Sequence, residues 1–91
     1  MIKIISYQPV KKGTCTGFIT IRFTKIGLEI RDCVVHKKND SRWIQLPAKP
    51  YKEGELTKWN HIIKFYMRDK ADQFQRLVLK AFDEYNQAPL K

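Results

Sequence analysis

The sequence is poor in cysteine and glycine, and each shortage removes a class of protein. Two cysteines, Cys15 and Cys33, are too few for a disulfide framework, and no Cys or His pair has the close spacing of a zinc knuckle. The four glycines are too scattered to cradle a nucleotide phosphate. We therefore expect reduced thiols, no metal and no cofactor.

Acidic residues are also few, and they are spread along the chain. A hydrolase or nuclease needs convergent carboxylates or a metal-binding set, and the nine Asp and Glu residues show no such grouping. His36 and Asp40 are the pair that most resembles a general base with its orienting partner. His61 lies among apolar residues and is expected at the edge of the core. The sequence predicts no enzyme and no small-molecule substrate.

Long hydrophobic runs are missing as well. Residues 1–10 contain no apolar stretch of the length that a signal peptide requires, and no segment approaches the length of a membrane span. We expect no membrane association and a cytoplasmic location, in a prokaryotic cell or a virus-infected host.

Positive charge is what the sequence has in excess. Eighteen Lys and Arg residues face nine Asp and Glu residues, which gives a net charge of +9 over 91 residues. This imbalance exceeds what solubility alone favours, and a polyanion is its simplest explanation.

Between His36 and Lys64, cations alternate with aromatic rings. Cations attract a phosphate backbone by releasing its counterions, and flat rings stack on bases whose faces are free, as in single strands. The ordinary alternative is a solvated set of lysines beside rings that pack inside the fold. The predicted phosphate ligands are Arg22, Arg31, Arg42, Lys49, Lys52, Lys58 and Lys64. The predicted stacking residues are Trp43, Tyr51 and Trp59.

The apolar pattern predicts one domain over residues 1–91. Residues 17–24 alternate, with Ile19 and Ile21 on one face and Arg22 on the other, as in a half-buried strand. A change of parity between residues 28 and 35 predicts a bulge near Arg31 and Asp32. We expect strands at about 2–7, 17–24, 28–36, 42–47 and 61–66, with residues 48–60 as a long connection.

The last element is a predicted helix over about residues 69–86. Asp69 is the expected N-cap. One apolar stripe recurs at three- and four-residue intervals, and its residues are Phe74, Leu77, Val78, Ala81, Phe82 and Tyr85. The fold class is therefore α+β: a curved antiparallel sheet of four to five strands, followed by one C-terminal helix packed on one face. The other face stays open, and the spare apolar residues Leu79 and Ile62 favour a homodimer.

Several short motifs follow one another along the chain. They are Ile30 to Val35, then Leu46-Pro47-Ala48-Lys49, Gly54-Glu55 and His61-Ile62, followed by a helix. This order of motifs resembles the SpoVG septation-regulator family. Ile62 replaces the proline of the family pattern, and Trp43 and Trp59 depart from its aliphatic positions. The resemblance implies a small dimeric DNA-binding protein and points to Lys49 and its basic neighbours. The strands-then-helix layout is also similar to the single-strand-binding transcriptional coactivator and Whirly folds.

Together these features predict a homodimer that binds single-stranded DNA or RNA through a basic sheet face with stacking aromatics, largely independently of sequence. Two alternatives stay open. One is a SpoVG-like regulator that binds duplex DNA with the tryptophans packed, and the other is an accessory factor whose open face binds an acidic protein.

Overall fold

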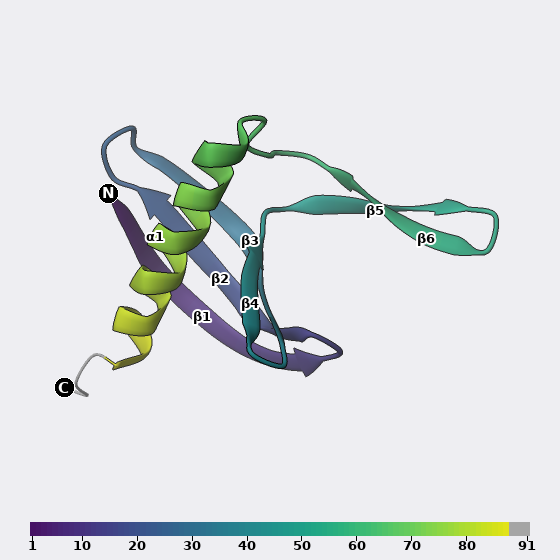
Figure 1. Cartoon of the computed structure of the whole chain (residues 1–91), viewed down its shortest axis with the longest axis horizontal. Helices are drawn as coiled ribbons and strands as arrows, with labels where there is room; N and C mark the ends of the chain where they lie inside the picture. Colours follow the sequence, from purple (N-terminus) through teal and green to yellow (C-terminus); the bar gives the residue numbers. More distant parts are fainter. Residues whose placement is uncertain (88–91) are drawn as a thin grey trace.

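The computed structural model describes residues 1–87, which form one antiparallel sheet, a separate hairpin and a helix (Figure 1). The sheet has the order β1-β2-β3-β4 and the hairpin pairs β5 with β6. The elements are β1 (Ile2–Lys12), β2 (Cys15–Phe23), β3 (Leu28–Lys38), β4 (Ser41–Gln45), β5 (Ala48–Glu53), β6 (Leu56–His61) and α1 (Arg68–Gln87). The predicted α+β class, with the helix on one face of the sheet, is confirmed.

The core lies between α1 and the sheet. Three helical residues spaced four apart, Phe74, Val78 and Phe82, are buried on one stripe of α1. The predicted stripe was too wide, because Ala81 is half-buried and Leu77 and Tyr85 are exposed. The sheet supplies the facing residues Ile4, Ile19, Ile21, Ile30, Cys33, Val35 and Ile44. The alternation in β2 therefore has the predicted orientation, because its isoleucines meet the helix and Arg22 faces the other way.

Cys33 is a fully buried core residue, as predicted. Burial raises the pKa of its thiol to about 12, and the neighbouring Asp32 carboxylate adds to this effect. Because only the thiolate is a good nucleophile, Cys33 has a structural and not a reactive role.

The predicted bulge at Arg31 and Asp32 is present in β3. Ile19 pairs with Cys33 and Ile21 pairs with Ile30, so β3 has one residue more than β2 over the same interval. Asp32 takes a φ of 60°, in the left-handed region that Asp tolerates better than most residues. The bulge restores the inward orientation of Cys33 and Val35 after Ile30.

Three predictions about the strands are wrong. β1 continues past residue 7 through Pro9 to Lys12, because β1 has a neighbour on one side only and an edge strand tolerates a residue without an N–H. Residues 48–60 are not a long connection but most of a hairpin. The expected strand at 61–66 is absent, since β6 ends at His61 and the chain then runs irregularly to α1.

The predicted N-cap is also wrong. The helix begins at Arg68, and the N–H of Ala71 donates to the carbonyl oxygen of Met67 at 3.0 Å. Met67 is therefore the N-cap residue, and Asp69 lies within the first turn, where its carboxylate favours the positive end of the helix dipole.

Candidate nucleic-acid interface

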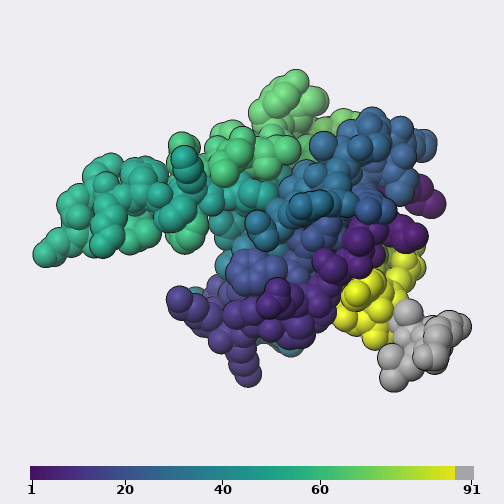
Figure 2. All heavy atoms as spheres, turned by 180° about the vertical axis from the view of Figure 1, so that it is seen from behind, coloured from purple at the N-terminus to yellow at the C-terminus, as the bar shows by residue number. Residues whose placement is uncertain are grey.

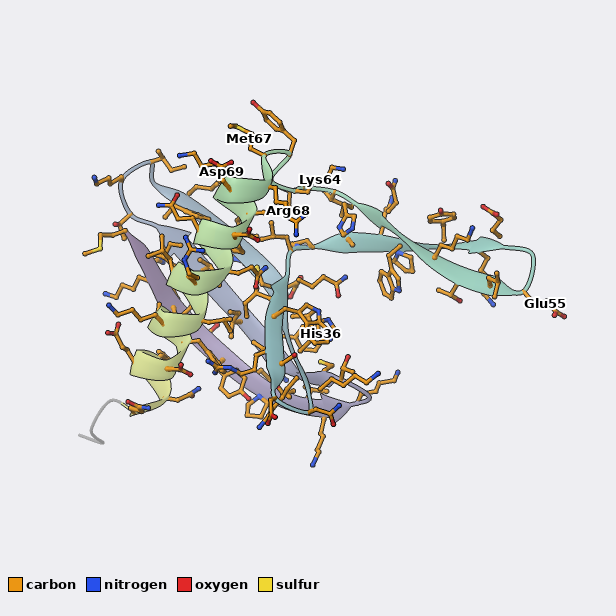
Figure 3. All side chains as sticks on the ribbon, viewed as in Figure 1. His36, Glu55, Lys64, Met67, Arg68 and Asp69 are labelled. Carbon is orange, nitrogen blue, oxygen red and sulfur yellow. The ribbon has the colours of Figure 1, made fainter. Side chains whose placement is uncertain are left out.

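The hairpin β5–β6, residues 48–61, projects from the sheet, and we call it the arm (Figure 1). Every residue of β6 is exposed, and in β5 only Ala48 is half-buried. Figure 2 shows the arm standing away from the rest of the surface, and Figure 3 places Glu55 at its tip. The arm has no core of its own, and an isolated two-stranded hairpin is only marginally stable in water. Its side chains are therefore accessible from solvent.

The pairing of the two strands sorts the side chains of the arm onto two faces. Pro50 pairs with Trp59 and Ala48 pairs with His61, so these residues share one face. Tyr51 pairs with Lys58 on the opposite face, together with Lys49. The two predicted stacking residues of the arm, Tyr51 and Trp59, thus point in opposite directions.

A cleft of about 460 Å³ lies where the arm meets the sheet and the start of α1. Its volume is typical of a small-molecule site. The residues that line it are Trp43, Ile44, Gln45, Leu46, Trp59, His61, Lys64, Phe65, Ala71, Phe74 and Gln75. The cleft thus unites both tryptophans with a lysine, although Trp43 lies on the sheet and Trp59 lies on the arm. Figure 3 shows Lys64 on the segment that leads from the arm to α1.

Trp43 is held by its neighbour on β3. The rings of His36 and Trp43 are stacked, with centroids 5.1 Å apart and planes at 14°. His36 is fixed in turn, because Nδ1 lies 2.8 Å from the hydroxyl of Thr14 and Nε2 lies 2.7 Å from the side-chain oxygen of Gln45. One face of the Trp43 indole is thus covered, and the side chain as a whole is still 37% exposed. Trp59 is more accessible, at 55%.

Four of the seven predicted phosphate ligands form ion pairs within the protein. Arg22 and Arg31 both bind Glu29, at 2.8 and 2.7 Å, and Lys58 binds Glu53 at 3.1 Å. The hydrogen bonds from Arg22 and then Arg31 hold the pKa of the Glu29 carboxyl below its ordinary value. Arg42 binds Asp83 of α1 through two hydrogen bonds, at 2.7 and 3.0 Å.

The other three predicted phosphate ligands have no such partner. Within residues 1–87, no carboxylate forms an ion pair with Lys49, Lys52 or Lys64. These lysines, on the arm and at its base, are the cations that a phosphate would meet without competition.

The predicted site residues are therefore only partly brought together. Trp43, Trp59 and Lys64 share the cleft, and Lys52 follows Pro50 on the cleft-facing side of the arm, nearer its tip. The remaining predicted residues lie elsewhere, and they are Arg22, Arg31, Arg42, Lys49, Tyr51 and Lys58. His61 is not at the edge of the core, since it is exposed at the base of the arm.

Sequence reasoning did not select Gln45 and Gln75 as site residues, although both line the cleft. Gln45 lies two residues after Trp43 on β4, so both side chains are on the same face of the strand. This spacing was the signal that could have identified Gln45. Gln75 lies on α1, far away in sequence, and no local pattern connects it with β4.

Searches against family models, curated proteins and solved structures find no match for this chain. The resemblance to SpoVG thus stays a prediction that depends on the motif residues alone. Across residues 1–87 there is no group of three or more His, Cys, Asp or Glu side chains placed to hold a metal ion. The one helix in this range, α1, is not long and apolar enough to cross a membrane.

Proposed function

We propose that this protein binds single-stranded nucleic acid, with an unpaired base in the cleft between β4 and the arm. The observation that carries the proposal is the convergence of Trp43, Trp59 and Lys64 on one cavity. Two indoles offer ring faces to a base, and the ammonium group of Lys64 offers a charge to the adjoining phosphate.

The shape of the site supports a single strand over a closed duplex. A base reaches a cleft of this kind only when it is unstacked from its neighbours, which costs least in a strand that has no partner. Lys49 and Lys52 on the arm extend the positive surface beyond the cleft. Outside the cleft, the contacts to the strand are electrostatic and largely independent of sequence.

The arm supports one second candidate, a duplex-binding regulator of the kind that the SpoVG resemblance implies. A two-stranded ribbon has the dimensions to enter the major groove of DNA, and the arm is such a ribbon with lysines on both faces. In that case the arm binds the groove and the cleft stays outside the interface.

A protein-binding accessory factor has support from a different segment. Ile62, Phe65, Tyr66 and Met67, between the arm and α1, are all exposed. Contiguous exposed apolar residues of this kind often mark protein interfaces. Such a factor is expected to bind nucleic acid weakly at any salt concentration.

Titration with labelled single-stranded DNA, single-stranded RNA and duplex, followed by tryptophan fluorescence, tests the proposal. We expect a single strand to bind more tightly than duplex. Trp43→Ala and Trp59→Ala should each weaken binding by about 1–3 kcal/mol, the contribution of one stacked base. Tyr66→Ala is the matched control, because Tyr66 is 89% exposed and lies outside the cleft.

The salt dependence of the same titration tests the electrostatic part. The logarithm of affinity should fall with the logarithm of salt concentration, by about 0.7 for each phosphate contacted on a single strand. Unchanged affinity in both tryptophan variants would remove the cleft from the interface. Preference for duplex would favour the arm-in-groove alternative.

We also propose a homodimer that acts in the cytoplasm. Support for the dimer comes from the arm, whose residues are nearly all exposed, and from Ile62 at its base, which is 65% exposed. Leu79, the other residue predicted for the subunit interface, is half-buried and packs against the core. The dimer proposal therefore no longer includes Leu79.

A further inference from the structure

Two amide side chains line the cleft beside the tryptophans, Gln45 from β4 and Gln75 from α1. An amide has one oxygen that accepts hydrogen bonds and one nitrogen that donates two. Which of these atoms is left for a ligand depends on the bonds that each amide already makes within the protein.

In both glutamines the oxygen already accepts one hydrogen bond from within the protein, which occupies one of its two lone pairs. The oxygen of Gln45 lies 2.7 Å from Nε2 of His36, which donates to it. The oxygen of Gln75 accepts from the backbone N–H of Ile44 at 2.8 Å, and its nitrogen donates to the carbonyl oxygen of Ile44 at 2.8 Å. The N–H donors that remain are two on Gln45 and one on Gln75.

Lys64 adds an ammonium group, which only donates. The side chains of Gln45, Gln75 and Lys64 thus offer the cleft more free donors than free acceptors, and His61, which also lines it, adds one ring nitrogen that can accept. A base that presents a carbonyl oxygen finds a partner in such a site. An exocyclic amino group finds other donors opposite it and loses hydrogen bonds to water without replacement.

We infer that the cleft selects an unpaired base with a carbonyl group, such as thymine, uracil or guanine, over a base with an amino group at the same position. This inference rests on the proposed function and adds a chemical preference at one nucleotide. Glutamine reads adenine by accepting from its amino group while donating to its ring nitrogen. In both glutamines of the cleft the oxygen is instead held by a donor of the protein itself, which disfavours that pairing.

His36 is a positioning residue in this arrangement. Its ring is held by the Thr14 hydroxyl on one side and by stacking on Trp43, so Nε2 is directed at Gln45. While Nε2 donates, the Gln45 amide stays with its oxygen toward His36 on β3, and its two N–H groups are left for a ligand. Without His36 the amide is able to turn over and present its oxygen.

The sharpest test compares two probes of about 12 nucleotides, oligothymidine and oligo-5-methyldeoxycytidine. Both carry the same methyl group and the same carbonyl group at C2. They differ at C4, which carries a carbonyl group in thymine and an amino group in 5-methylcytosine, and at N3, which donates in thymine and accepts in 5-methylcytosine. We expect the wild-type protein at neutral pH to bind oligothymidine about three- to tenfold more tightly, which is the effect of one net hydrogen bond. The measurement is competition for a fluorescent single strand, with tryptophan quenching as a second readout.

Two variants separate positioning from binding. Gln45→Met keeps the size of the side chain without its donors. The affinity ratio of the two probes should fall toward one, because Gln75 and Lys64 still donate, and both probes should still quench tryptophan fluorescence. His36→Phe keeps a ring against Trp43 but releases the Gln45 amide, so the ratio should fall as well. Thermal unfolding checks that each variant is folded. If either variant is not folded, the ratio of the wild-type affinities for the two probes decides whether the base preference exists.

Each outcome has a distinct meaning. Saturable quenching by both probes with equal affinity, or tighter binding of the 5-methylcytosine probe, would overturn the base preference and leave the proposed function standing. If neither probe bound or quenched, the proposed function itself would be wrong.

Discussion

At the scale of single residues, Arg42 has a different partner from the one that its sequence context suggests. It lies in the basic segment, next to Trp43, and was predicted to bind phosphate. In the structure its guanidinium group binds both carboxylate oxygens of Asp83. Asp83 is on the last element of the chain, so only the tertiary fold places the two side by side. The sequence showed the charge of Arg42 but not its neutralising partner.

This ion pair predicts a small stability effect that depends on pH. The hydrogen bond from Arg42 lowers the pKa of Asp83 below its ordinary value of 3.8. The pair therefore contributes fully above that value, and its contribution is lost as the pH falls through the lower pKa of the folded state. Since both side chains are more than a third exposed, Asp83→Asn should cost no more than about 1 kcal/mol at neutral pH.

Urea unfolding of the wild type and Asp83→Asn, at neutral pH and again below about pH 3, checks this prediction. The difference between the two proteins should shrink at the lower pH. Asp72→Asn serves as the control, because Asp72 is exposed on the same helix and forms no ion pair within residues 1–87. A difference that stayed constant with pH would exclude the pair as its source.

At the scale of elements, the sequence predicted well wherever an element buries one face. β2, β3 and α1 each place apolar residues at the spacing of their own geometry, and burial enforces that spacing. The arm was missed for the same reason. It buries almost nothing, so its sequence lacks an apolar alternation, while Pro50 and Gly54 resemble the signals of a loop.

The opposite error occurred just after the arm. Ile62, Ile63 and Phe65 form an apolar run that resembles a strand, but no strand within residues 1–87 pairs with it. Phe65 instead packs its ring against Phe74 of α1, with centroids 5.0 Å apart. A short apolar run shows that a segment needs contacts, and it does not show which geometry will supply them.

Gln75 gives the prediction at this scale, because it covers the free edge of β4. β4 pairs with β3 on one side only, and the Gln75 amide binds both backbone groups of Ile44 on the other side. Gln75→Leu should therefore destabilise the protein by about 1–3 kcal/mol, the cost of leaving partly buried polar groups unpaired. The measurement is urea unfolding with unchanged slope.

Gln73→Leu is the matched control for this variant. Gln73 is exposed on the same helix and has no role at the edge of β4. It should therefore change the free energy of unfolding by less than about 0.5 kcal/mol. If both variants lost the same stability, the loss would come from the helix surface and not from the strand edge.

At the scale of the whole molecule, the sheet with α1 forms the packed body and the arm extends from it (Figure 1). We predict that light scattering at micromolar concentration gives twice the mass of one chain. Ile62→Glu, at the base of the arm, should shift the protein toward the monomer, since a charge in an apolar interface has no partner there. A monomer mass for the wild type would contradict the homodimer.

Ile26→Glu is the control for the dimer test. Ile26 is 73% exposed, close to the 65% of Ile62, but it lies at the turn between β2 and β3. It should leave the mass unchanged. Dissociation by both variants would mean that added negative charge, and not the place of the substitution, controls association.

The narrow root of the arm has a mechanical consequence. The arm leaves the body at Pro47 and returns at Ile62, whose N–H donates to the carbonyl oxygen of Pro47 at 3.3 Å. Strands of this length reach about 20 Å, so a tilt of roughly 10° at the root displaces the tip by on the order of 3 Å. The wall of the cleft, close to the pivot, shifts far less. If a ligand in the cleft tilts the arm, the distance between a fluorescent label on the tip and another on the sheet should therefore change more than any distance within the cleft.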